Sequence, residues 1–376
     1  MQLVAYGAQD VYLTGNPQIT FFKVVYRRHT NFSTEAIEQT INGTVAAGGR
    51  VSVTISRNGD LVGRTFVELT SASGDTDVAN FGAAAFASVT LEIGGQQIDK
   101  HYGDWMEAWA ELSEPNTACT VGTGGDAVGT LFQNMSGMGG VAVDGDGNAV
   151  KSHVPLQFSF CRNPGLALPL IALQYHEVKL TLEFSSVNGT GSGLAAKVYC
   201  DYHYLDTDER RRFAQVSHEY LIEQVQRQSL TAASLSHELN FNHPVKELVW
   251  TGAVTNTATF GLLNDVTFKL VLNGHDRMSA RDAKYFCETQ VWQHHTGCGG
   301  LTQTAGLGGQ FGSRRIAVYS FALKPEEHQP SGTCNFSRID NARLIAGGAP
   351  SIGNIYAVNY NVLRVMSGMG GLAYSN

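Results

Sequence analysis

Charged residues are scarce in this chain. Asp, Glu, Lys and Arg make up 16 % of its 376 residues, whereas an average soluble domain contains roughly 25 %. The formal net charge is −7, and no run of basic residues is longer than Arg210–Arg212. Because binding to nucleic acid depends on clustered Lys and Arg, this composition is poorly suited to wrapping a phosphate backbone. The low charge indicates instead that other protein chains cover part of the surface.

Long hydrophobic runs and paired cysteines are also missing. No apolar stretch reaches the ~18 residues of a membrane-spanning helix, so we expect none. The start of the chain lacks the basic residues and long apolar core of a secretory signal, so we expect no signal peptide. The six cysteines include no Cys-x-x-Cys pair, which favours free thiols over disulfides.

The sequence contains no recognisable catalytic motif. Neither Gly-x-Ser-x-Gly nor His-Glu-x-x-His occurs, and the Gly-rich stretches lack the spacing of a nucleotide-binding loop. Asp144–Asn148 resembles the start of a calcium loop, but Ala149 and Pro155 stand where that loop needs Gly and Glu. The histidines show no metal-ligand spacing. We therefore predict no enzyme activity, no cofactor, and no catalytic, cofactor-binding or metal-binding residues.

Glycine and short apolar segments are abundant. The 42 glycines favour many tight turns. Short stretches rich in β-branched and aromatic residues recur with turn residues between them, which is typical of antiparallel sandwiches and not of βαβ units. Each half of the chain carries roughly eight such stretches, the number that a jelly roll needs. The predicted fold class is all-β, with two tandem eight-stranded antiparallel jelly-roll sandwiches joined by a short helical linker.

The linker is the segment 206–220, the most helix-like part of the sequence. Asp206 or Thr207 can cap a helix N-terminus there, and Asp206 and Arg210 have the spacing of a helical ion pair. The predicted organisation is an N-terminal segment at 1–18, a first sandwich at 19–205, the helical joint, and a second sandwich at 221–376.

Turns, one loop and one short helix can also be predicted. Asn58-Gly59 and Asn273-Gly274 are hairpin signals. Residues 112–152 are rich in Gly, Thr, Ala and Asp without any period, and we expect a long exposed loop there. Just before it, Trp105 and Trp109 are spaced to share one face of a short helix.

Two sets of candidate site residues remain. Asn134 and Asn188 lie in Gly-rich regions and are the candidate glycan acceptors among the Asn-x-Ser/Thr sequences. The candidate contacts with a neighbouring subunit or with the joint are basic, and a solvated strand end is the alternative for the first three; they are Arg27, Arg28, His29, Arg210, Arg211 and Arg212.

Several long blocks of sequence resemble the major capsid proteins of large icosahedral double-stranded DNA viruses, of the type found in chloroviruses and other algal viruses. The blocks keep the family's order from near the first residue to the last. They are Gly7–Phe32, Ile55–Leu61, Leu91–Trp105, Asn163–Leu180, Leu205–Gln215, Phe321–Ala342 and Asn359–Asn376.

The resemblance implies a structural capsid protein in the virion. Three chains would form a homotrimeric capsomer of pseudo-hexagonal outline that tiles an icosahedral shell, with assembly in the cytoplasm of the infected cell. Segment 1–18 would lie at the capsomer base, facing minor capsid proteins or an inner viral membrane, and loop 112–152 would project outward toward the host surface. No direct contact with the genome is expected.

Two alternatives remain from the sequence. The first is a minor capsid or spike paralogue of the same fold. The second is a carbohydrate-binding or carbohydrate-cleaving β-sandwich, for which hydrolysis would require paired carboxylates. Glu326 and Glu327 are adjacent in sequence and are candidates for such a pair, as are Glu35 and Glu38.

Overall fold

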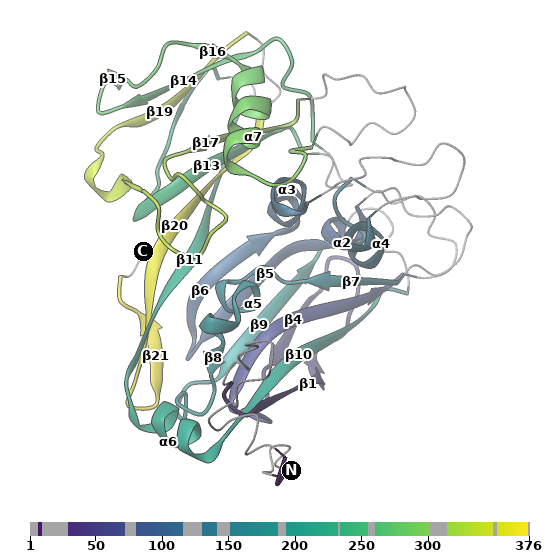
Figure 1. Ribbon diagram of the computed structural model, residues 1–376. Coiled ribbons are helices and arrows are strands. Elements are labelled where there is room, and N and C mark those ends of the chain that lie inside the picture. The colour runs from purple at the N-terminus through teal and green to yellow at the C-terminus, as the bar shows by residue number, and fades with distance from the viewer. Residues whose placement is uncertain are drawn as a thin grey trace, which may run out of the picture.

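The chain folds into two antiparallel β-sandwiches, one above the other in Figure 1. The computed structural model describes residues 7–9, 29–71, 80–115, 130–140, 151–186, 193–231, 234–254, 260–300, 314–348 and 352–374. Within these ranges no helix is long and apolar enough to cross a membrane.

The first sandwich has one sheet of order β1-β10-β4-β7, with β8 paired to β4, and a second sheet of order β2-β3-β9-β5-β6. Successive side chains of a strand point to opposite faces of its sheet, and one face of each sheet is turned inward. Val67 and Leu69 of β4 are therefore buried, whereas Phe66 and Glu68 are partly exposed. The strands are β1 (Phe32–Gln39), β2 (Ile41–Asn42), β3 (Arg50–Thr54), β4 (Leu61–Thr70), β5 (Phe86–Ile93), β6 (Gln96–Tyr102), β7 (Lys151–Pro155), β8 (Leu168–Pro169), β9 (Val178–Phe184) and β10 (Ala195–Leu205).

The second sandwich repeats this arrangement. One sheet has the order β11-β20-β13-β17, with β18 and β21 at its margins, and the other has the order β12-β19-β14-β15, with β16 also paired to β14. The strands are β11 (His218–Ser229), β12 (Ser236–Glu238), β13 (Pro244–Gly252), β14 (Thr267–Leu272), β15 (His275–Asp276), β16 (Arg281–Asp282), β17 (Ile316–Ser320), β18 (Cys334–Asn335), β19 (Ala342–Gly347), β20 (Ile352–Met366) and β21 (Met369–Leu372).

Short helices occupy the connections. They are α2 (Phe81–Ala84), α3 (Gly103–Ser113), α4 (Leu131–Ser136), α5 (Ser159–Arg162), η1 (Pro164–Leu166), α6 (Thr207–Gln215), the π-helical turn η2 (Tyr285–Thr289), α7 (Gln290–His294) and η3 (Phe336–Arg338).

Strands β11 and β20 extend beyond the second sandwich and run beside the first (Figure 1). Ile355 and Ala357, near the start of β20, pack in the core of the second sandwich. Leu363 and Val365 near its end, together with Ile222 of β11, pack in the core of the first. The two sandwiches therefore share strands as well as a boundary.

The predicted fold class is confirmed, including the helical linker. Asp206 is the N-cap residue of α6, and its carboxylate accepts a hydrogen bond from the Thr207 N–H at 2.7 Å. Strand β11 starts at His218, so the last residues of the expected joint are extended rather than helical. Because Arg210 turns to Asp60 of the first sandwich, it does not form the expected pair with Asp206.

The hairpin signals gave one correct and one wrong prediction. Asn273 and Gly274 have positive φ angles of 52° and 75° and close the β14–β15 hairpin, as expected. Asn58-Gly59 does not close a hairpin, because β3 pairs with β9 and β4 pairs with β10. The chain crosses there from one sheet of the sandwich to the other.

The expected exposed loop at 112–152 is contradicted in its middle. Residues 131–136 form α4, which is closed by a capping box between Thr130 and Gln133. Met138 is buried, and the Gly139 N–H donates to both carboxylate oxygens of Glu107 at 3.1 Å. This part of the segment is anchored because its backbone N–H groups donate hydrogen bonds to a carboxylate that α3 carries into the interior. The rest of the expected loop, apart from residues 112–115 and 151–152, lies outside the described residues.

Candidate functional site: the junction between the two sandwiches

Helix α3 of the first sandwich forms the centre of the junction. Trp105 and Trp109, one turn apart as the sequence predicted, are both buried there. The Trp105 ring centroid lies 5.0 Å from that of Tyr356 in β20. The same apolar cluster includes Val249 of β13 and Val318 of β17, so α3 packs on the outer face of the β11-β20-β13-β17 sheet.

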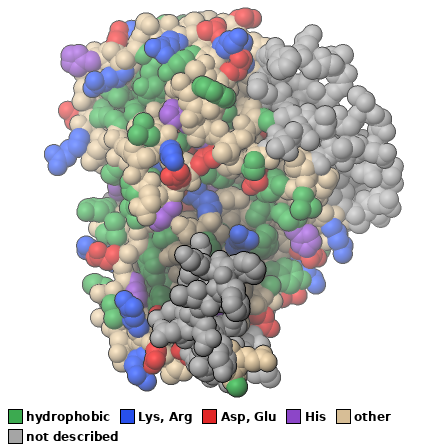
Figure 2. All heavy atoms as spheres, in the orientation of Figure 1, with side chains coloured by type: hydrophobic (Ala, Val, Ile, Leu, Met, Phe, Trp, Pro, Cys, Tyr) green, Lys and Arg blue, Asp and Glu red, His purple; other side chains and the backbone are tan. Residues whose placement is uncertain are grey.

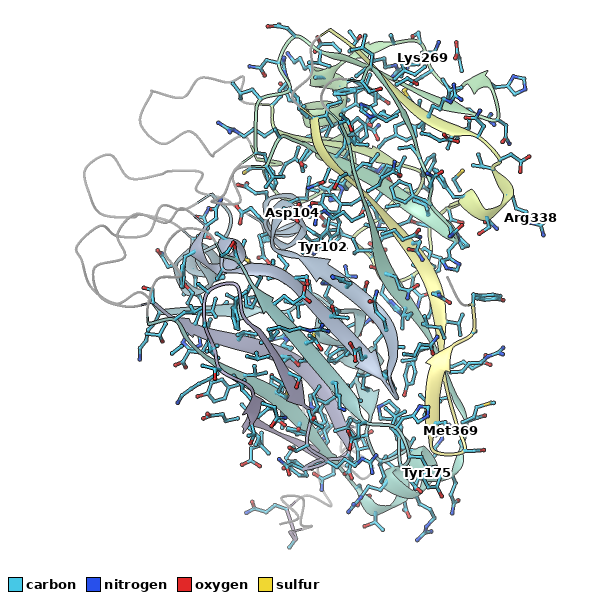
Figure 3. The ribbon with its side chains drawn as sticks, turned by 180° about the vertical axis from the view of Figure 1, so that it is seen from behind. Tyr102, Asp104, Tyr175, Lys269, Arg338 and Met369 are labelled. Carbon is cyan, nitrogen blue, oxygen red and sulfur yellow. The ribbon has the colours of Figure 1, made fainter. Side chains whose placement is uncertain are left out.

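A buried carboxylate ties α3 to the second sandwich. Asp104 accepts a hydrogen bond from the Asn354 side-chain amide at 2.6 Å and lies 3.3 Å from the Arg227 guanidinium. That guanidinium also stacks 4.3 Å from the centre of the Tyr102 ring. Figure 3 shows Tyr102 and Asp104 together between the two sandwiches. One arginine of β11 thus contacts two residues of the first sandwich, which fixes the position of α3.

A second ionic group crosses the junction between α5 of the first sandwich and strands β11 and β13 of the second. Arg162 of α5 lies 2.6 Å from one carboxylate oxygen of Glu223, and Lys246 lies 2.7 Å from the other. The Lys246 side chain is fully buried and also donates to the Pro325 carbonyl at 2.6 Å. Burial lowers the pKa of Lys246, and the charge of Glu223 opposes that shift. The cost of burying these charges is offset only because each has a partner.

His295, just beyond α7, completes the charged part of the junction. Its Nε2 lies 3.0 Å from Glu247 and its Nδ1 lies 3.0 Å from Glu326. Burial by itself lowers the pKa of His295, but the charge and hydrogen bond of Glu247, with those of Glu326, raise it to about 9. The next residue, Thr296, donates from its hydroxyl to the Ser113 carbonyl at the end of α3 at 2.7 Å.

A pocket of about 230 Å³ opens beside these charges, lined by residues of both sandwiches. Its main charged groups, Arg162 and Glu223, already pair with each other. Glu326 binds His295 and Thr296, whereas Glu327 pairs with Lys324 at 2.7 Å. The adjacent glutamates therefore have different partners and do not form the carboxylate pair that glycoside hydrolysis needs.

The described residues offer few other groups that could form a binding or catalytic site. They contain no cluster of three His, Cys, Asp or Glu side chains placed to hold a metal ion. On the face shown in Figure 2, basic and acidic side chains are interspersed rather than gathered into one basic patch. The residues that the fold brings together thus hold two sandwiches in a fixed relation.

Comparison with known proteins agrees with this architecture. Residues 20–206 match the family described as "Major capsid protein N-terminus", and residues 209–347 match "Large eukaryotic DNA virus major capsid protein". This chain belongs to that family. The capsid assignment covers both sandwiches, and the two matched regions meet at α6.

Individual relatives extend over the whole chain. The major capsid protein of Pyramimonas orientalis virus is 52 % identical over 100 % of this chain and 99 % of its own length. That of Paramecium bursaria Chlorella virus 1 is 43 % identical over the same shares. A solved structure entitled "PBCV-1 virus capsid, quasi-atomic model" matches with a TM-score of 0.78 and 38 % identity, covering 95 % of this chain and 100 % of the other.

The described residues among the predicted contact residues of this capsid protein lie in different environments. The Arg210 Nε lies 2.9 Å from one carboxylate oxygen of Asp60, a buried residue just before β4. The other oxygen of that carboxylate accepts the Leu205 N–H at 2.9 Å. Arg211 and Arg212 are exposed on α6 and form no ion pair with any described residue. His29 is exposed, with its Nδ1 3.1 Å from the Thr30 carbonyl oxygen. Arg27 and Arg28 lie outside the described residues.

The glycan acceptors remain predictions. Asn134 is exposed on α4, but Ser136 of the same sequence motif is buried and donates its hydroxyl to the Phe132 carbonyl. Asn188 lies outside the described residues.

Sequence reasoning missed the charged residues of the junction. One signal was present: Lys246 and Glu247 interrupt the apolar run of β13, Pro244–Gly252, whose residues after Pro244 are all buried. Two adjacent charges inside a buried strand need partners from elsewhere. Their partners, Glu223 and His295, are far away in the sequence and carry no motif that points to them.

Proposed function

We propose that this capsid protein forms homotrimeric capsomers of pseudo-hexagonal outline that tile an icosahedral shell. Each chain contributes two sandwiches with the same sheet order, so three chains supply six similar units around one axis. The observation that supports this best is the rigid junction, where the α3 cluster and two ion pairs, Asp104–Arg227 and Arg162–Glu223, fix one sandwich relative to the other.

The same proposal assigns the partners and the place of assembly. The capsomer contacts neighbouring capsomers at its sides and minor capsid proteins or an inner viral membrane at its base, to which segment 1–18 belongs. The long loops at the other end face the host surface, and assembly takes place in the cytoplasm of the infected cell. The role is structural, without enzyme activity or direct genome contact.

The mass of the purified protein in solution tests this proposal. Light scattering on a sizing column should give a species near three times the chain mass of 40.5 kDa. Because obligate interfaces bury large apolar areas, that species should persist in high salt. A clean monomer at micromolar concentration would contradict the trimeric capsomer.

A further inference from the structure

One row of side chains on the outer face of the second sandwich is covered by the chain itself. Val249 of β13 stands opposite Val318 of β17 on one side and Tyr356 of β20 on the other. The exposed fraction of each of these side chains is 0 % or close to it, because Trp105 and Trp109 of α3 lie over them. Helix α3 follows β6, at the margin of the other sheet of the first sandwich.

The first sandwich has a corresponding row that remains partly exposed. Its sheet order β1-β10-β4-β7 corresponds to β11-β20-β13-β17. In it, Phe66 of β4 stands opposite Pro155 of β7 and Tyr199 of β10. All three side chains are partly exposed, and their strand neighbours Val67 and Val198 face the core instead. An aromatic and apolar row of this kind on an outer sheet face is a surface that a partner can cover.

The second sandwich, in turn, carries a helix with an exposed tryptophan. Helices η2 and α7 follow β16 as α3 follows β6. Trp292 of α7 is 81 % exposed, although the residue before it, Val291, is buried against α3. The helix is held in place, because the Gln290 side chain bonds to the Tyr285 hydroxyl at 3.0 Å and to the Ser320 N–H at 3.2 Å. A solvent-exposed tryptophan on a firmly held helix is the kind of residue that often forms an energetic hot spot in a protein interface.

We propose that Trp292 of one copy packs on the Phe66–Tyr199 row of the next copy. The contact that α3 makes on the second sandwich within one chain is then repeated by α7 on the first sandwich of the neighbouring chain. A repeated contact between different surfaces closes into a ring when the rotation fits, and three chains with two sandwiches each provide that ring. This inference rests on the proposed trimer and assigns the residues of its subunit interface.

Substitutions on both sides of this contact test it. Trp292→Ala and Tyr199→Ala should each weaken trimer association at least about thirtyfold, the loss expected for a hot-spot side chain. The measurement is light scattering over a dilution series, with circular dichroism to show that the chain is folded. Tyr175→Ala is the matched control, since Tyr175 is 76 % exposed and lies at the opposite end of the molecule near α6 (Figure 3). It should leave the trimer unchanged.

A crosslink shows the contact directly. The photoreactive residue p-benzoylphenylalanine, placed at position 292 of the full chain, should link to peptides that contain Phe66 or Tyr199 of another copy. The same residue at position 175 should not. A wild-type trimer that Trp292→Ala leaves intact, or crosslinks from position 292 only to other surfaces, overturns the proposed interface while the trimer stands. A monomeric wild type overturns both.

Discussion

At the scale of single residues, the geometry of His295 sets its charge. A neutral imidazole has one N–H donor, yet both ring nitrogens lie 3.0 Å from carboxylate oxygens, those of Glu247 and Glu326. When both carboxylates are ionised, both contacts are hydrogen bonds only if the ring is an imidazolium. Its positive charge is what permits Glu247, which is fully buried, to remain ionised, and it holds the pKa of Glu247 below its ordinary value against the opposing effect of burial.

Replacing His295 should therefore destabilise the protein in a pH-dependent way. We expect His295→Gln to lower the free energy of unfolding by about 3 kcal/mol at pH 6, since it leaves buried carboxylates without their cation. The folded-state pKa of about 9 exceeds the ordinary value of 6.5. The stabilisation by His295 is therefore complete below pH 6.5 and is lost as the pH rises through 9.

Urea unfolding at pH 6 and pH 10 measures this effect. The difference between wild type and His295→Gln should shrink at the higher pH. His294→Gln is the control, because His294 lies beside it and, among the described residues, its ring hydrogen-bonds to the Leu323 carbonyl rather than to a carboxylate. A difference that stays constant across this range would show that His295 acts through packing alone.

At the scale of elements, α6 is attached to the first sandwich by one of its three arginines. Arg210 reaches the buried Asp60, whereas Arg211 and Arg212 point into solvent. Phe213 of α6 also packs with Leu61 and Leu205. The direction in which the chain enters β11 thus depends on this ion pair, on the apolar contact, and on His218 of β11, whose Nε2 lies 2.8 Å from the Phe213 carbonyl oxygen.

Matched alanine substitutions in α6 should distinguish these arginines. Arg210→Ala should reduce the free energy of unfolding by about 1.5 kcal/mol, because a charged hydrogen-bond donor is removed from a buried carboxylate. Arg211→Ala should change it by less than about 0.5 kcal/mol, as is usual for exposed side chains. Chemical denaturation of both variants under the same conditions provides the test, and equal effects would mean that the Asp60 contact adds no stability.

At the scale of the whole molecule, the two sandwiches behave as one structural unit. The cluster around α3 joins them on one side, and the far ends of β11 and β20 enter the first core on the other. Apolar contacts that bridge the two parts in this way are expected to couple their unfolding. The proposed capsomer also requires a fixed relation between the sandwiches, because each neighbouring chain would pack against both.

Removing the central tryptophan should uncouple the sandwiches. At a fixed protein concentration, calorimetry of the wild type should show a single transition. Trp105→Ala should cost about 3–5 kcal/mol, since it leaves a cavity against Tyr356, and should split the transition into two. Leu131→Ala, at an 85 % exposed position, is the control. A single transition at an unchanged midpoint in Trp105→Ala would rule out this role of α3.

The sequence by itself determined the features that depend on neighbours along the chain. Alternating apolar residues, the hairpin at Asn273-Gly274, the cap at Asp206 and the shared face of Trp105 and Trp109 are all local, so their physical causes can be seen in a short window. Family membership could also be predicted from the sequence alone, because the blocks that resemble capsid proteins are long and continuous.

Tertiary structure alone decided which residues meet across the chain. Asn58-Gly59 looks like a hairpin turn, but the burial of β3 and β4 in different sheets overrides it. Lys246 finds Glu223 and Glu247 finds His295 only after the strands have paired. The contrast between the covered row at Tyr356 and the open row at Tyr199 likewise exists only in the folded molecule. Such contacts depend on burial and on distance in space, so a charged pair inside an apolar strand indicates that partners are needed but not which residues they are.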